Sequence, residues 1–334
     1  MEQLSTMEKL FTVFDNTATL LQEELGCSYL EAVAETGENI FQNTILQQDE
    51  ISELSKKRLE KEYSNVNLNR TNVEEIRKAF QLAILKGMKQ ATQPNHQMTP
   101  DAVAIFMGYL VSKFTEQRKE FTIADPAVGT GNLLTSILNQ NLSKEIEAYG
   151  IDVDDLLVKL AFVSANLQQH SIQLYNQDSL QPLYIDPMDI VVCDLPVGYY
   201  PNDIGAAGYE LRAKEGHSYA HHLFIEQSLK YTKEGGYLLF LVPNHLFTSE
   251  QAKDLNAYLK ENSIIQGMIQ LPLSLFKDEK AAKSIFILQK KGKDVKVPKQ
   301  ALLVDLPKFS NKVAMSGIID QIDTWFKNEK NNSK

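Results

Sequence analysis

Residues 121–134 read FTIADPAVGTGNLL, an apolar run that leads into a turn with two glycines and then into a helical pattern. This order predicts a β-strand, a tight turn and the start of a helix. Gly129 and Gly131 allow backbone conformations and close approaches that a Cβ atom forbids, and the helix start offers free N–H groups. The turn can therefore hold a nucleotide-like ligand, although a Gly-x-Gly pattern alone is a weak signal.

The chain beyond about residue 100 alternates short apolar runs with helical patterns. Alternation of this kind predicts an α/β protein with a Rossmann-like, doubly wound and mainly parallel sheet, covered by helices on both faces. The expected strands are residues 121–124, 148–151, 172–175, 190–193, 237–242, 267–270 and 284–288. The expected helices among them are residues 133–138, 156–167, 223–231 and 251–260.

The first 90 residues show helical periodicity and no clear strand. Thr71 and Glu74 have the spacing of a capping box ahead of an apolar helix face, which predicts a helix start there. Residues 93–100 contain two prolines and no apolar period, as is typical of a connector. We therefore expect an N-terminal all-helical domain over residues 1–92 and an α/β domain over residues 93–334.

The distribution of charge is uneven along the 334 residues, whose net charge is −9. Residues 1–62 hold 13 acidic and 5 basic residues, so the front of the chain carries most of the negative charge. A protein that binds DNA through its phosphate groups usually has a basic surface. Residues 277–299 contain eight lysines, and a solvated surface explains them as well as a nucleic-acid patch does. An acidic helical front also suits contact with a protein partner.

The cysteines and histidines predict neither a disulfide nor a metal site. Cys27 and Cys193 are far apart in the sequence and fit no metal or disulfide framework, which favours a reducing compartment. His217, His221 and His222 have neither an H-E-x-x-H arrangement nor a cysteine cluster around them. The first residues lack a signal-peptide pattern, and no apolar run is long enough to span a bilayer. We expect a cytoplasmic protein without a metal or a membrane association.

Three acidic residues follow the first three expected strands. Asp125 ends the first, Asp152 ends the second and Asp178 follows the third. Open α/β sheets bind ligands at the carboxyl ends of their strands, so these carboxylates are expected along one edge. A single Asp at such a place often only caps a helix or ends a strand, but three together favour a ligand site.

The same acids discriminate between cofactors. Leu134 stands where a dinucleotide site has its third glycine, and Asp125 beside the turn repels a diphosphate. S-adenosylmethionine has no phosphate, carries a sulfonium and an ammonium group, and presents hydroxyl and amino donors that suit carboxylates. We assign Asp125 to its methionine end or to a water beside it, Asp152 to the ribose diol and Asp178 to the adenine amino group.

The fourth expected strand ends in Asp194-Leu195-Pro196-Val197, which we interpret as the chemistry position. Methyl transfer from a sulfonium requires an aligned lone pair on the incoming nitrogen. Asp194 and the carbonyl group of Leu195 can accept the two N–H groups of a conjugated amine and so localise its lone pair, while Pro196 stiffens the turn. The alternative is that the strand simply continues into a loop that has no catalytic role.

These motifs together resemble the class I S-adenosylmethionine-dependent methyltransferases that act on the adenine amino group in DNA. Within that family, the chain is most similar to modification subunits of type I restriction systems and to the shorter bacterial YtxK-like proteins. The resemblance runs from about Asn95 to Lys291, and the helical front is reminiscent of the same branch. It rests on residues 97–100, 125–131, 150–152, 176–178, 236–243 and 271–276.

The resemblance implies the class I methyltransferase fold, S-adenosylmethionine as cofactor and DNA as partner. The implied catalytic residues are Asp194, Leu195 and Pro196. The implied cofactor-binding residues are Thr99, Asp125, Pro126, Ala127, Gly129, Gly131, Asn132, Leu133, Asp152, Val153, Asp178, Ser179, Asp194 and Pro196.

One motif departs from the family pattern. Adenine methyltransferases have Asn, Asp or Ser, then Pro-Pro, then an aromatic residue, whereas this chain has Asp194, Leu195, Pro196 and Val197. Val197 cannot stack on a flipped base as an aromatic ring does. The expected function is therefore N-methylation of an amino group, with adenine in DNA implied by the resemblance. The alternatives are another planar nitrogen, such as a glutamine amide of a protein, and a cofactor-binding regulatory protein without catalysis.

Overall fold

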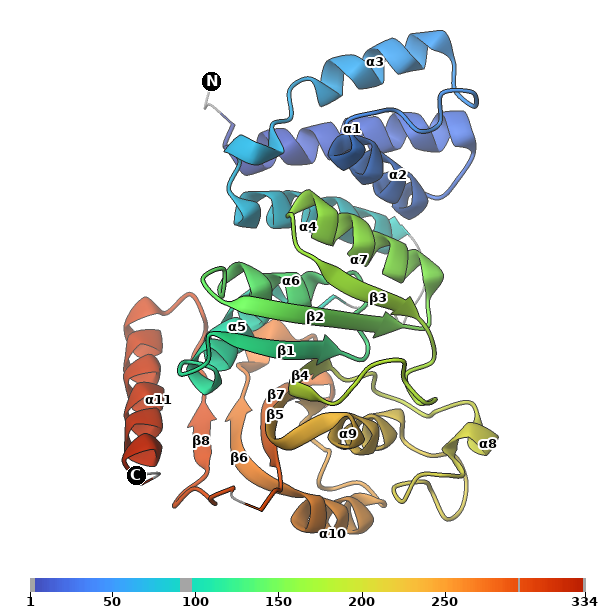
Figure 1. Cartoon of the computed structure of the whole chain (residues 1–334). Helices are drawn as coiled ribbons and strands as arrows, with labels where there is room; N and C mark the ends of the chain where they lie inside the picture. The colour runs from blue at the N-terminus through green and yellow to red at the C-terminus, as the bar shows by residue number, and fades with distance from the viewer. Residues whose placement is uncertain (1–3, 91–97, 294, 333–334) are drawn as a thin grey trace. The chain divides into compact units, whose positions relative to one another are not determined.

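The computed structural model describes residues 4–90, 98–293 and 295–332 of the chain (Figure 1). Most of the expected connector at residues 93–100 lies outside this described part. The chain divides into two compact units. The first comprises residues 1–108, 128–142 and 150–176, and the second comprises residues 109–127, 143–149 and 177–334. The domain boundary expected at residue 92 remains a prediction.

The front of the first unit is helical, as expected. Its helices are α1 (Thr6–Leu25), α2 (Tyr29–Gln42), α3 (Glu53–Tyr63) and α4 (Val73–Gln90). The capping box predicted at Thr71 is wrong. The Thr71 hydroxyl donates to the Asn67 carbonyl group, and the Asn72 side chain accepts from the Glu74 backbone N–H at 2.8 Å. Glu74 instead binds Arg77 through its side chain, so the spacing alone misassigned the capping residue.

The front helices share one hydrophobic core with a helix of the α/β part. Helices α1, α2 and α4 pack together, and α2 and α4 also contact α7 (Asp155–Leu167; Figure 1). Phe14 and Phe80 meet edge to face at 5.3 Å, and Leu160 and Val163 of α7 are fully buried in the same cluster. Because these apolar faces cover each other, the front helices bury surface that α7 would otherwise expose.

The strands form one eight-stranded sheet in the order β3-β2-β1-β4-β5-β7-β6-β8. Strand β4 pairs in parallel with β1 and β5, whereas β7 runs antiparallel to β5 and β6. The predicted Rossmann-like, mainly parallel α/β fold is thereby confirmed. The strands are β1 (Glu120–Asp125), β2 (Glu145–Asp152), β3 (Ile172–Asn176), β4 (Met188–Asp194), β5 (Thr232–Pro243), β6 (Ser263–Gln270), β7 (Lys283–Lys290) and β8 (Leu302–Asp305).

The second unit has its own core around β4, β5 and β7. Phe240 and Phe286 are fully buried there, and α9 packs on β5 while α10 packs on β6. Helix α11 lies beside β8 (Figure 1). No described helix has the length and apolar character needed to cross a membrane. The remaining helices are α5 (Asp101–Phe114), α6 (Asn132–Asn139), α8 (Asp203–Ala206), α9 (Ala220–Lys230), α10 (Ala252–Asn262) and α11 (Lys312–Asn332).

Candidate functional site

The predicted acidic residues stand at the carboxyl ends of their strands. Asp125 is the last residue of β1, Asp152 of β2 and Asp194 of β4, and Asp178 follows β3 by two residues. These four strands are consecutive in the sheet order. Parallel strands present their carboxyl ends at one edge, where open α/β sheets bind ligands. The ligand-binding roles of the four residues remain predictions.

The glycine turn in the first unit is built around Asp152. The Gly129 backbone N–H donates to Asp152 Oδ2 at 2.8 Å, and the Asp154 N–H donates to Oδ1 at 3.0 Å. Gly129 and Gly131 have φ values of 53° and 77°, in the left-handed region that favours glycine. A Cβ atom at Gly131 would lie 3.2 Å from the Ala161 Cβ atom, so α6 approaches α7 closely at this point.

The carboxylate of Asp152 keeps room for a ligand. The side chain is only half-buried. Burial raises the pKa of the Asp152 carboxyl group, whereas the hydrogen bonds from the Gly129 and Asp154 N–H groups lower it. A carboxylate has about four acceptor sites, and the two observed bonds leave capacity for hydroxyl donors. The side chain of Val153, also predicted to touch the cofactor, is 73% exposed.

A buried arginine of the helical front holds the start of α6. Arg77 is 1% exposed, and its Nη1 donates to Asn132 Oδ1 at 2.7 Å while its other nitrogens bind Glu74 and Asp101. Asn132 in turn donates to the Thr99 carbonyl group at 3.2 Å. The side chains of Asn132 and Leu133, both predicted to bind cofactor, are therefore buried in structural contacts. Arg77 was missed because its partners Asp101 and Asn132 are distant in the sequence.

In the second unit, Asp125 binds the backbone of the residues that directly follow β1. Its side chain is 1% exposed and accepts from the Ala127 backbone N–H at 3.1 Å. The Ser179 hydroxyl donates to the Pro126 carbonyl group and ties the segment after β3 to the same turn. Burial, together with the Asp125 and Asp194 carboxylates, raises the pKa of the Cys193 thiol well above its ordinary value. Cys193 is therefore an unreactive core residue.

Asp178 is hydrogen-bonded to Tyr200, which follows the segment 194–197. Tyr200 donates its hydroxyl to Asp178 Oδ2 at 2.6 Å, and the Leu180 N–H donates to Oδ1 at 2.9 Å. Tyr200 is 7% exposed, so it cannot replace the aromatic residue that the motif lacks. Tyr199 has the opposite character, because its ring is 62% exposed and stacks on Tyr219 at 5.1 Å.

Asp194, the predicted catalytic residue, is paired with Lys283, a member of the lysine-rich stretch at residues 277–299. Lys283 Nζ lies 2.5 Å from Asp194 Oδ1, and each side chain is 20% exposed. The Leu195 backbone N–H donates to the Leu241 carbonyl group at 3.2 Å, which anchors the turn. Leu195 is buried, whereas Pro196 is exposed. Lys283 therefore differs from a freely solvated lysine, because its side chain is mostly buried against Asp194.

Two histidines near the turn are buried and neutral. His221 and His222 are 2% and 0% exposed, and burial lowers their pKa values to about 3 and about 4. Neither nitrogen of His222 has a hydrogen-bond partner in the described part of the chain. Both rings pack against Tyr219. Across the described residues, no group of three His, Cys, Asp or Glu side chains is placed to hold a metal.

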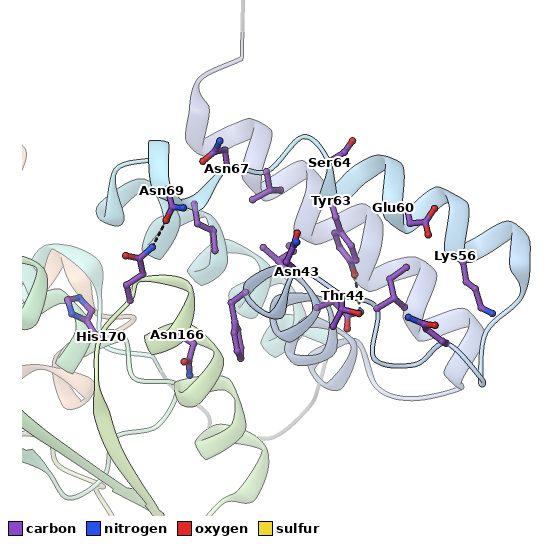
Figure 2. Close-up of a pocket in the computed structure, with 18 of the residues that line it drawn as sticks. Asn43, Thr44, Lys56, Glu60, Tyr63, Ser64, Asn67, Asn69, Asn166 and His170 are labelled. Atoms are coloured by element: carbon purple, nitrogen blue, oxygen red, sulfur yellow. Dashed lines mark hydrogen bonds between the residues drawn. The ribbon is translucent and has the colours of Figure 1, made fainter.

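A large polar cleft of about 1220 Å³ lies elsewhere, in the first unit (Figure 2). It is bordered by the ends of α2, α3 and α7, and amide side chains are the most frequent kind in its lining. In it, Gln169 donates to Asn69 Oδ1 at 2.9 Å, and Lys56 and Glu60 supply opposite charges (Figure 2). None of the predicted site residues lines this cleft. The cofactor prediction therefore rests on the strand ends and not on the cleft.

Comparison with known proteins decides the family. Residues 85–334 match the profile described as N-6 DNA Methylase. The chain belongs to the N-6 DNA methylase family. Residues 8–88 match the YtxK N-terminal helical domain, so the resemblance inferred from the motifs is confirmed in both parts.

Several relatives of this N-6 DNA methylase family member cover nearly its whole length. The uncharacterized protein YtxK of Bacillus subtilis (strain 168) is 50% identical over 96% of this chain and 98% of its own. A candidate class I S-adenosylmethionine-dependent methyltransferase from Listeria monocytogenes is 48% identical, with a TM-score of 0.89 over 96% of this chain and 98% of that one.

A more distant structure shares the fold alone. The methyltransferase subunit of a type I restriction-modification system from Streptococcus thermophilus is 15% identical, with a TM-score of 0.64 over 95% of this chain and 74% of that one. Together, the family match and these structures support a methyltransferase.

Proposed function

We propose that this protein binds S-adenosylmethionine and transfers its methyl group to the amino group of a neutral, planar acceptor, with adenine in DNA as the first candidate. The observation that carries the proposal is the position of Asp194, a hydrogen-bond acceptor at the carboxyl end of β4 in an N-6 DNA methylase fold. A carboxylate there can bind the N–H of an incoming amine. The free thiols of Cys27 and Cys193 fit a cytoplasmic location.

The residues at the strand ends fit this cofactor. We assign the half-buried carboxylate of Asp152 to the ribose diol and that of Asp178 to the adenine amino group, since both can accept further hydrogen bonds. The start of α6 has no side-chain cap among the described residues, so its N–H groups suit the methionine carboxylate. A diphosphate would meet the carboxylate of Asp152 instead, which disfavours NAD and ATP.

The chemistry turn has the groups that methyl transfer to nitrogen requires. S-adenosylmethionine supplies a methyl group activated by its sulfonium. Asp194 and the Leu195 carbonyl group accept the two N–H groups of the acceptor and turn its lone pair toward that methyl. Pro196 restricts the backbone of the turn, and the bond from Leu195 to Leu241 fixes its position on β5. Asp194 also favours departure of the proton that the methylated nitrogen releases.

The cofactor assignment gives a prediction for binding. Replacing Asp152 or Asp178 with alanine is expected to weaken S-adenosylmethionine binding about 10- to 50-fold, because each removes a charged acceptor of ligand N–H or O–H groups. Asp155→Ala, on an exposed carboxylate three residues after Asp152, is the matched control and should leave affinity within twofold. Isothermal titration calorimetry measures the affinity of the three variants and of wild type for S-adenosylmethionine. Unchanged affinity in both test variants would contradict the assignment.

The acceptor is identified with tritium-labelled cofactor. Purified protein is incubated with unmethylated DNA, RNA and protein extract, and the label in each fraction is counted. Label in DNA at adenine supports the proposal in full, whereas label in protein bands selects a side-chain amide as the acceptor. No label in any fraction, despite demonstrated cofactor binding, overturns the enzymatic proposal in favour of a cofactor-binding regulatory protein.

A further inference from the structure

Lys283 and Asp194 form an ion pair at the proposed reaction centre. Strand β7 runs antiparallel to β5, and Lys283 is paired with Pro243, the last residue of β5. The first residue of β7 therefore lies at the same edge as the last residue of β4. The parallel strands end at this edge of the sheet, whereas the antiparallel strand β7 begins there. The ammonium group of Lys283, its first residue, therefore lies at the edge where the parallel strands end.

The pairing changes the charge that a bound cofactor would meet. Both side chains are four-fifths buried, so water and salt screen them less than a surface pair. An isolated carboxylate beside a sulfonium would favour the cationic cofactor over the neutral thioether product. Such attraction stabilises the ground state and does not by itself accelerate transfer. Lys283 offsets that attraction while its bond to Oδ1 holds the Asp194 carboxylate in one orientation.

We propose that Lys283 is a specificity-determining and positioning residue, which neutralises Asp194 and so sets the relative affinity of the site for S-adenosylmethionine and S-adenosylhomocysteine. This inference rests on the proposed function, because it needs the sulfonium to bind beside Asp194. The same pair has no net negative charge with which to attract a protonated alkyl amine, and it admits uncharged amino groups such as that of adenine.

A purely structural ion pair is the competing explanation. It predicts that loss of Lys283 lowers stability without changing the preference between the two ligands. A control pair lies near the opposite end of β4, where Lys233 Nζ is 2.9 Å from Asp189 Oδ2. Asp189 also pairs with Arg118, and Lys233 is more exposed than Lys283, so Lys233→Met removes a lysine–aspartate contact away from the proposed reaction centre while Asp189 keeps a cationic partner.

The test is calorimetric titration of S-adenosylmethionine and S-adenosylhomocysteine into the full-length protein and its variants. Lys283→Met is expected to raise the preference for S-adenosylmethionine about five- to twentyfold over wild type, because the carboxylate is then uncompensated. Lys283→Gln should act in the same direction if the methionine variant fails to fold. Lys283→Arg, Lys233→Met and the double variant Asp194→Asn/Lys283→Met should keep the wild-type preference within about threefold.

The outcomes separate this inference from the proposed function. If wild-type protein binds neither ligand, the proposed function fails and this inference fails with it. If wild-type protein binds both ligands but Lys283→Met and Lys283→Gln leave the preference unchanged, the cofactor assignment stands and the role of Lys283 is overturned. An equal change in Lys233→Met would also overturn it, because the effect would then not depend on the reaction centre.

Discussion

Replacing Asp194 with alanine is expected to lower methyl transfer about 100- to 1,000-fold at saturating cofactor. The variant loses the acceptor that orients the incoming amine, while the Leu195 carbonyl group remains. Asp194→Asn should keep activity within about tenfold of wild type, because an amide oxygen still accepts a hydrogen bond. Labelled transfer to the acceptor found for wild-type protein measures both variants.

The fold must be intact for this comparison to be valid. Removing the Asp194 carboxylate leaves the Lys283 ammonium without its partner, which itself destabilises a partly buried site. The double variant Asp194→Ala/Lys283→Met avoids that cost and should be as inactive as Asp194→Ala. Full activity in either alanine variant, with an unchanged melting temperature, would show that the chemistry does not use Asp194.

The free energy of unfolding is expected to decrease as the pH is lowered, because of the two buried histidines. Burial depresses the folded pKa values of His221 and His222 to about 3 and about 4, whereas an unfolded histidine titrates near pH 6.5. Between these values the unfolded chain binds more protons than the folded one. The stabilisation is therefore complete above about pH 7 and is lost progressively as the pH falls from about 6.5 to the folded pKa values of about 4 and about 3.

A single substitution isolates this effect. His222→Phe removes a titrating ring whose nitrogens have no partner among the described residues, and keeps its approximate size. Between pH 6 and pH 5, wild type should lose about 1.2 kcal/mol more unfolding free energy than the variant. Urea denaturation at a series of pH values measures the difference. His217→Phe is the control, because the His217 side chain is 62% exposed, and an equal slope in wild type and His222→Phe would contradict the account.

The first seven strands were predictable because each contains a short apolar run. In most of them this run is buried, whereas β3 has no buried residue. Strand β8 was missed since Leu302–Asp305 spans only four residues and is buried on alternate positions. The buried positions 103, 104, 107, 110 and 111 of helix α5 follow a helical period, but the helix was missed because its other face also carries apolar residues such as Ile105, which masks the contrast between the faces. Helix α11 was also missed, although it packs on β8.

The residues of the candidate site were predictable where the local sequence determines their position. They were not predictable where a partner distant in the sequence determines it. Asp152 and Gly129 lie at a strand end and a glycine turn, and both features are visible in the sequence. The partners of Asn132, Asp178 and Asp194 come from segments 22 to 89 residues away, so no spacing rule could identify them. The position of Lys283 could not be predicted because it depends on the antiparallel direction of β7. That direction places the first residue of β7 at the edge where the parallel strands end.

The central claim is that the strand-end carboxylates bind a cationic nucleoside thioether and not a phosphorylated nucleotide. Calorimetric titration of wild-type protein with S-adenosylmethionine, NAD and ATP tests it most directly. The account predicts that S-adenosylmethionine binds at least about 100-fold more tightly than either of the others. Tight binding of NAD or ATP, with no heat from S-adenosylmethionine, would contradict it.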